Sequence, residues 1–186
     1  MRFKPISLLL CAITLVALAA AWVALRSAPL QPRPGKPAAP EATGESRVSE
    51  AYLYFADPRT EYLSAETRSL SHSPGPAALA RAIVEALIVG PASDRARTIP
   101  EQTVLDGIYI DDVATAYVDL SAAVVDAHPG GAHSELMTVF SIVNSLILNV
   151  PQIKRVKLLV GGRDASSLAG HIDLRQPLTA NMLIVR

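Results

Sequence analysis

The clearest alternation of apolar and polar positions lies between Ser134 and Pro151, and it predicts a helix. We expect Ser134 to cap the start of this helix, because a serine side chain can accept a hydrogen bond from the first turn, and Pro151 to end it. The predicted apolar stripe comprises Leu136, Phe140, Val143 and Ile147, flanked by Val139 and Leu146. Such a stripe belongs in the core, so this helix should be the centre of the folded domain.

The other side of the same helix carries only small neutral groups. They are Thr138, Ser141, Ser145 and Asn149, and no charged residue lies between Glu135 and Pro151. A helix with so thin a polar strip is either packed on most of its circumference or presents the strip to a partner. We take Thr138, Ser141, Ser145 and Asn149 as the candidate interaction strip, and an exposed sheet edge is the alternative contact surface.

Shorter periodic segments surround this helix. Strand-like composition is found at 48–56, 103–110, 114–120 and 155–160, with weaker candidates at 62–69 and 182–185, and a second helix is predicted over 77–89. A tight turn at 111–113 should join two of the strands, although Val113 suits a left-handed turn position poorly. The order strand, helix, two strands, helix, strand predicts an α+β fold with two helices on one face of a small mixed sheet.

The N-terminal part has a different organisation. We divide the chain into a membrane anchor or signal segment at 1–26, a proline-rich linker at 27–47 and a folded domain at 48–186. The apolar run at 6–25 has the length of a membrane-spanning helix. Two alternatives remain open: a cleaved signal peptide ending near Ala19–Ala21, and a lipoprotein modified at Cys11. All three place the domain on the extracytoplasmic, periplasmic side of the cytoplasmic membrane.

The overall composition narrows the possible functions. Hydrophobic residues make up 50% of the chain and charged residues 18%, with 17 basic and 17 acidic side chains. Nucleic-acid binding needs a basic stripe, which this balance does not provide, so no nucleic-acid partner is expected. The single cysteine excludes a disulfide within one chain.

Histidines are the main candidates for chemistry. His128 and His133 lie near Asp126 and Glu135 and could hold a metal, but their spacing matches no defined ligand pattern, and solvated loop histidines are the simpler interpretation. His72 lies between two serines but would need a third orienting group to act as a base. We therefore expect no catalytic residue, metal or cofactor.

The remaining polar positions are interpreted as structural. His171 and Asp173 would lie on one side of an extended segment, yet a turn held by side-chain hydrogen bonds explains them more simply. Gly161 and Gly162 should form a turn after a strand. Asn144 should satisfy a buried backbone group, and the Asp111–Asp112 pair should lie in water at a turn.

Several of these segments resemble the GerMN domain family, named for a sporulation and germination protein. The similar stretches are Ala86-Leu87-Ile88-Val89-Gly90-Pro91, Ile99-Pro100-Glu101-Gln102-Thr103, Val118-Asp119-Leu120-Ser121, Ser141-Ile142-Val143-Asn144-Ser145-Leu146, Val156-Lys157-Leu158-Leu159-Val160-Gly161-Gly162 and Gly170-His171-Ile172-Asp173. The family often has glycine where Val113 and Gln102 stand here. The resemblance covers about 48–173 in the same order.

The resemblance implies an extracytoplasmic α+β domain of bacterial envelope proteins, similar to ring-building domains and without an established enzymatic activity. Together with the anchor and linker, it favours a non-catalytic, membrane-tethered interaction or assembly module that binds envelope proteins or itself. The alternatives are an envelope hydrolase or metal-dependent enzyme that uses His128, His133 or His171, and a small-ligand sensor.

Overall fold

The computed structural model describes residues 46–186. The predicted anchor at 1–26 and nearly all of the predicted linker lie outside these residues, and Arg47 at the end of that linker is the first residue of a strand. None of the helices within residues 46–186 combines the length and the apolar character that crossing a membrane requires.

The described part is α+β, with strands and helices close to the predicted ranges. Its elements are β1 (Arg47–Ala56), β2 (Leu63–His72), α2 (Pro76–Val89), β3 (Leu105–Ile110), β4 (Thr115–Leu120), α3 (Ala123–Asp126), α4 (Ala132–Asn149), β5 (Arg155–Val160), β6 (Arg163–Asp164) and a 3-10 helix (Met182–Ile184). The weak candidate at 62–69 is a full strand, whereas the candidate strand at 182–185 is wrong, because that segment forms the 3-10 helix. The sequence pattern did not predict α3 or β6.

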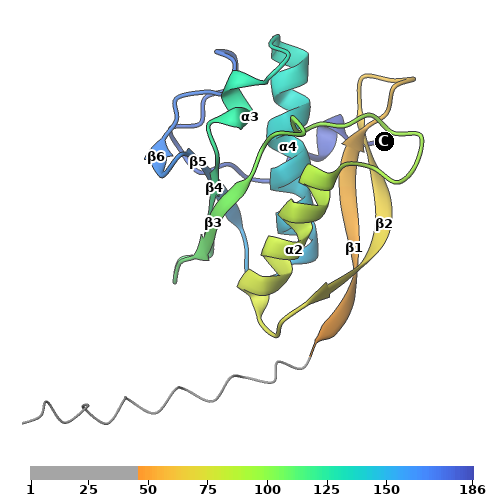
Figure 1. The fold of residues 1–186 in the computed structure, drawn as a ribbon, viewed down its shortest axis with the longest axis vertical. Helices are drawn as coiled ribbons and strands as arrows, with labels where there is room; N and C mark the ends of the chain where they lie inside the picture. Colours follow the sequence, from red (N-terminus) through yellow and green to blue (C-terminus); the bar gives the residue numbers. More distant parts are fainter. Residues whose placement is uncertain (1–45) are drawn as a thin grey trace, which may run out of the picture. The chain divides into compact units, whose positions relative to one another are not determined.

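The strands form two sheets, which corrects the prediction of one mixed sheet with helices on one face. β1 and β2 form an antiparallel pair, and the second sheet has the order β3-β4-β5-β6. β4 and β5 run parallel, so the chain crosses between them through α4. Figure 1 shows α2 and α4 between the two sheets: α4 contacts β1 and β5, and α2 contacts β1, β2 and β3.

The helix α4 is packed on most of its circumference. Its side chains with no exposed surface include Val139, Ile142, Val143 and Leu146, while Leu136, Phe140 and Ile147 are partly buried. The core therefore centres on a face next to the predicted stripe. The helix begins at Ala132, after Gly130 and Gly131 with positive φ, so Ser134 lies inside the first turn and does not cap it.

The β3–β4 turn uses a different residue from the one that the pattern indicated. Ala114 has a φ of 62°, and Val113 does not occupy the left-handed region. The Asp111 carboxylate accepts hydrogen bonds from the N–H groups of Val113 and Thr115 at 3.0 and 2.8 Å. The aspartate therefore holds the turn, and the strand β4 starts at Thr115.

Candidate interaction surface

The candidate interaction strip on α4 faces into the domain. The Asn149 side chain accepts a hydrogen bond from the Tyr52 N–H and donates one to the Tyr52 carbonyl, both at 2.8 Å. The Ser145 hydroxyl accepts one from the Tyr54 N–H at 3.0 Å. These two side chains occupy the outer edge of β1 as a neighbouring strand would.

The other half of the strip also has partners within the domain. Thr138 and Ser141 are 1% and 0% exposed. The Thr138 hydroxyl donates to the Thr98 carbonyl at 2.6 Å, and the Thr98 and Ser141 hydroxyls share a hydrogen bond at 2.9 Å. The proposal that this strip faces a partner is therefore corrected, because its polar groups satisfy β1 and the loop before β3.

His128 makes its hydrogen bonds to groups other than carboxylates. His128 accepts a hydrogen bond from the Gly130 N–H through Nδ1, and its Nε2 lies 3.0 Å from the Thr138 hydroxyl. Burial lowers the pKa of His128, and the carboxylate of Glu135 opposes this shift. His133 is exposed, and residues 46–186 contain no cluster of three side chains able to hold a metal.

Glu135 is a buried acid whose role the sequence pattern did not predict. Its side chain has no exposed surface, and its carboxylate accepts hydrogen bonds from the N–H groups of Leu168 and His171 at 2.8 and 2.7 Å. Desolvation would raise the pKa of Glu135, but these backbone donors, with those of Ala169 and Ile172, lower it. The carboxylate therefore orders the 168–172 loop, and the only signal in the sequence was one acid in an otherwise apolar helix.

His171 and Asp173 lie in that loop but have separate partners. The His171 Nδ1 atom is 3.2 Å from the Glu135 carboxylate, and the ring is 45% exposed. Asp173 instead pairs with Arg175 through two hydrogen bonds of 2.9 and 2.8 Å. His171 therefore joins this segment to α4, and Asp173 makes its hydrogen bonds within the turn.

His72 makes the contact that a serine–histidine pair would require, although its partner is Ser49. The Ser49 hydroxyl lies 2.9 Å from the His72 Nε2 atom, and Nδ1 lies 2.6 Å from the Ser73 carbonyl. A backbone carbonyl carries no full charge to stabilise a protonated imidazole, unlike the aspartate of a catalytic triad. This contact joins the start of β1 to the end of β2.

The remaining predicted structural residues lie at turns and chain crossings. Gly161 and Gly162 both have positive φ between β5 and β6, and the Gly162 N–H donates to the Asp119 carboxylate at 2.8 Å. Asn144 exchanges two hydrogen bonds of 2.9 Å with the backbone of Asn181. Its side chain thus fixes the C-terminal segment to α4.

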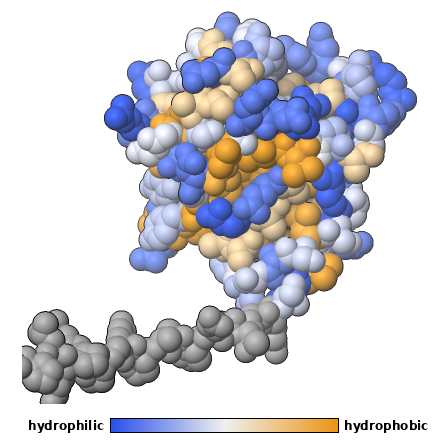
Figure 2. All heavy atoms as spheres, in the orientation of Figure 1, coloured by the Kyte–Doolittle hydropathy of each residue, from blue (hydrophilic) through white to orange (hydrophobic). Residues whose placement is uncertain are grey.

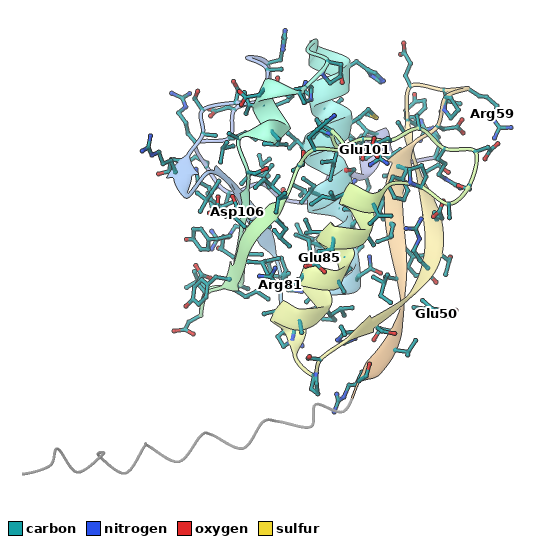
Figure 3. All side chains as sticks on the ribbon, in the orientation of Figure 1. Glu50, Arg59, Arg81, Glu85, Glu101 and Asp106 are labelled. Carbon is teal, nitrogen blue, oxygen red and sulfur yellow. The ribbon has the colours of Figure 1, made fainter. Side chains whose placement is uncertain are left out.

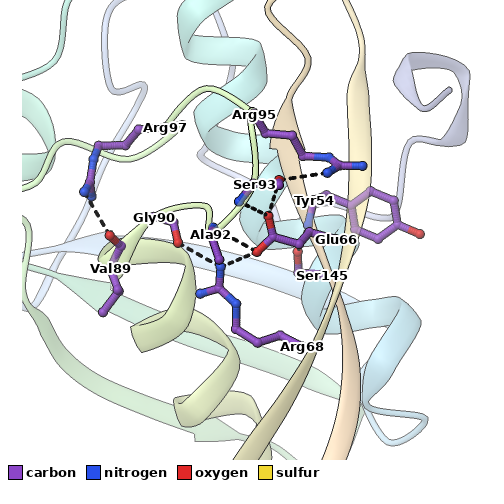
Figure 4. Close-up of polar contacts among 10 residues, drawn as sticks. All are labelled: Tyr54, Glu66, Arg68, Val89, Gly90, Ala92, Ser93, Arg95, Arg97 and Ser145. Carbon is purple, nitrogen blue, oxygen red and sulfur yellow. Dashed lines mark hydrogen bonds and ion pairs between the residues drawn. The ribbon is translucent and has the colours of Figure 1, made fainter.

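A buried ionic cluster holds the end of α2 against β2 (Figure 4). Glu66 accepts hydrogen bonds from the Ala92 and Ser93 N–H groups at 3.1 Å and also contacts Arg68. Arg68 donates to the Gly90 carbonyl at 3.1 Å, where a cation also suits the negative end of the helix dipole. Desolvation would raise the pKa of Glu66, but these donors and the Ser93 hydroxyl lower it to about 2.

An apolar groove between α2 and β3 is the most distinctive exposed feature. It encloses about 280 Å³, and its lining residues are Glu85, Ile88, Val89, Thr103, Val104 and Leu105. Val89 and Val104 are 72% and 57% exposed, which is high for side chains of this type. Figure 2 shows hydrophobic atoms gathered on this face, with hydrophilic groups around them.

A buried polar atom beside the groove has no partner. The Thr103 hydroxyl is buried, and it makes no hydrogen bond within the part of the chain that the structure describes. A buried hydroxyl without a partner costs free energy and usually has a functional or structural reason. This orphaned group lies next to the two most exposed valines of the groove.

The charges around the groove are mainly negative. Figure 3 shows Glu85, Glu101 and Asp106 on this face, with Arg81 beside Glu85. Arg81 and Glu85 pair at 3.5 Å, and Arg97 donates to the α2 carbonyls of Ile88 and Val89. Within residues 46–186, Glu101 and Asp106 make no ion pair, so these two carboxylates of the rim have no cation partner.

A second hollow of about 300 Å³ lies near the start of α4. Its lining is mostly apolar and includes Ile99, Pro100, Pro129 and Met137, with His133 among them. No carboxylate lines this hollow, so it does not supply an acid beside the histidine for hydrolytic chemistry.

Comparison with known proteins settles the family. The family model Germane, described as sporulation and spore germination, matches residues 52–166. The chain belongs to the Germane family. No curated protein matches the chain at a significant level.

Solved structures support the same fold for this Germane domain. A candidate lipoprotein from Clostridium perfringens is 23% identical, with a TM-score of 0.53 over 72% of this chain and 87% of that one. The first GerMN domain of the sporulation protein GerM from Bacillus subtilis is 22% identical, with a TM-score of 0.54 over 72% and 96%. The tandem GerMN domains of GerM are 20% identical with a TM-score of 0.58, and this chain spans 46% of their length.

The matched range contains the α2–β3 groove but not the C-terminal segment. Residues 52–166 include all six groove-lining residues, whereas Ile172, Asn181 and the 3-10 helix follow the matched range. The groove therefore lies within the part of this chain that matches the family.

Proposed function

We propose that this chain is a non-catalytic interaction module of the bacterial cell envelope and that the α2–β3 groove is its binding face. The apolar run at 6–25 tethers the domain to the cytoplasmic membrane, with the domain on the extracytoplasmic side. The similarity to a candidate lipoprotein and to domains of a sporulation protein supports an envelope setting.

The observation that carries this proposal is the exposure of Val89 and Val104 beside the unpartnered Thr103 hydroxyl. Apolar side chains gathered in one groove favour contact with another protein.

The acidic rim defines the chemistry of the partner. Glu101 and Asp106 lack cations within the described residues, so the best complement is an apolar segment of an envelope protein flanked by lysine or arginine. Such a segment would place its apolar residues on Val89 and Val104 and its basic residues on the rim.

Site-specific photocrosslinking in intact cells tests the groove directly. A photoreactive residue at Val104 should give a discrete adduct with an envelope protein, and the crosslinked peptide should be apolar with basic flanks. Leu183, which is 84% exposed outside the groove, is the matched control position. Equal adducts from Val104 and Leu183, or a crosslinked peptide that is acidic or wholly polar, would contradict the proposal.

A further inference from the structure

The backbone hydrogen bonds of the β1–β2 sheet leave one edge open. The Tyr52 N–H and carbonyl both bond to Asn149, so they point away from β2. Tyr52 is paired with Thr67, and in an antiparallel ladder the backbone groups of such a pair both point outward. The same alternation turns the N–H and carbonyl groups of Ala65, Ser69 and Ser71 outward from β2.

Within residues 46–186, the outward backbone groups of Ala65, Thr67, Ser69 and Ser71 have no backbone partner. Only Leu63, the first residue of β2, has one. The Leu63 carbonyl accepts a hydrogen bond from the Arg186 N–H at 2.9 Å, and no further backbone contact reaches the β2 edge. Figure 1 shows β2 as the outermost strand of its sheet, on the side of β1 that faces away from α4. The edge from Ala65 to Ser71 is therefore open to solvent.

The other strand edges in the described residues are partly covered, irregular or short. Asn149 and Ser145 cover β1, and the Ala56 carbonyl accepts a bond from the Ala96 N–H at 2.8 Å. The register of β3 is broken between Leu105 and Gly107, and β6 has two residues. Proteins usually protect free edges with charge, proline or a bulge, and the outward positions of β2 carry only alanine, threonine and serine.

The sequence of β2 is complementary to itself about Thr67. If two copies pair antiparallel with Thr67 opposite its equivalent, Glu66 lies opposite Arg68 and Ala65 opposite Ser69. Glu66 and Arg68 bind each other within their own domain, this register places no like charges opposite each other, and the paired threonines are favourable across the strands. Each of Ala65, Thr67 and Ser69 would then donate and accept one hydrogen bond.

We propose that β2 is a self-association edge, through which two copies of this chain join their hairpins into one continuous four-stranded sheet. A two-stranded sheet is marginal alone, and two added strands satisfy its open edge. The proposal is independent of the α2–β3 groove, because β2 and the groove use different residues.

Disulfide crosslinking of the full-length chain in its membrane fraction tests the edge. In a Cys11→Ser background, Thr67→Cys should form a homodimer on mild oxidation. Ser71→Cys is the matched control: it is exposed on the same edge, but the proposed register separates its two copies by roughly 27 Å, at about 3.4 Å per residue. We expect at least about tenfold more dimer from Thr67→Cys.

Two additional variants separate the edge from other contacts. Adding Ser69→Pro, which removes an unused N–H from the edge, should reduce the Thr67→Cys dimer at least about fivefold. Adding Val104→Lys in the groove should leave the dimer yield unchanged. Equal yields at Thr67 and Ser71, adducts of Thr67→Cys with a different protein, or a dimer that Ser69→Pro leaves intact would overturn the proposal.

Discussion

At the residue scale, buried carboxylates order the loops of this domain. Glu135 lies in the first turn of α4, yet its side chain turns inward and receives the N–H groups of the 168–172 loop. Glu66 does the same for the residues that follow α2. In both cases a charged side chain is kept buried by several hydrogen-bond donors, which offset the cost of removing it from water.

Replacing Glu135 by glutamine should destabilise the domain by about 2 kcal/mol, since an amide NH₂ would face backbone N–H groups that need an acceptor. Urea denaturation of residues 46–186 measures this change in the free energy of unfolding. Glu101→Gln, at an exposed side chain, is the control and should stay within about 0.5 kcal/mol of the wild type. An unchanged free energy of unfolding for Glu135→Gln would contradict the role of this carboxylate.

Glu66 should make the stability depend on acid pH. Its pKa is lowered from 4.5 to about 2 in the folded domain, so its contribution is fully present above pH 4.5 and is lost as the pH falls toward 2. Glu66→Gln should flatten the free energy of unfolding across this window, and Ser93→Ala, which removes one donor, should flatten it partly. If both variants keep the wild-type pH dependence, the cluster does not shift this pKa.

At the element scale, polar side chains of α4 make the hydrogen bonds to the outer edge of β1 that a neighbouring strand would make. Periodicity located α4, α2 and most strands, because burial repeats every 3.6 residues in a helix and every second residue in a strand. It could not show which neighbour α4 would meet, since Thr138, Ser141, Ser145 and Asn149 are equally compatible with an external partner and with an internal strand edge. The pattern also could not predict the division into two sheets, because that division depends on the contact between α4 and the edge of β1.

Asn149→Ala should cost about 1 to 2 kcal/mol, because the Tyr52 N–H and carbonyl lose their hydrogen bonds to the side chain. Hydrogen exchange at the Tyr52 amide should also become faster. The matched control is Gln152→Ala, which removes an exposed amide side chain just after α4. A Tyr52 amide that exchanges equally slowly in Asn149→Ala would show that α4 does not protect the β1 edge.

At the scale of the whole molecule, this domain leaves two surfaces open: the α2–β3 groove and the β2 edge. The sequence did not predict the groove, because the groove joins a helix and a strand whose apolar residues looked like core. It indicated an exposed sheet edge as a contact surface but not which edge, because that depends on which backbone groups α4 covers. The candidate histidines His128, His72 and His171 instead contact separate partners. We therefore propose binding at the exposed valines and not at the histidines.

Photocrosslinking from Val104 in a variant with a reversed rim tests whether the groove binds the partner. We expect Glu101→Lys with Asp106→Lys to lower the yield of the envelope-protein adduct at least about fivefold, since both acids would face the basic flanks of the partner. Glu50→Lys with Glu61→Lys, at exposed positions of the β1–β2 region, should leave the yield unchanged. An adduct that forms equally well with the reversed rim would contradict the groove as the site that recognises an apolar, basic-flanked partner.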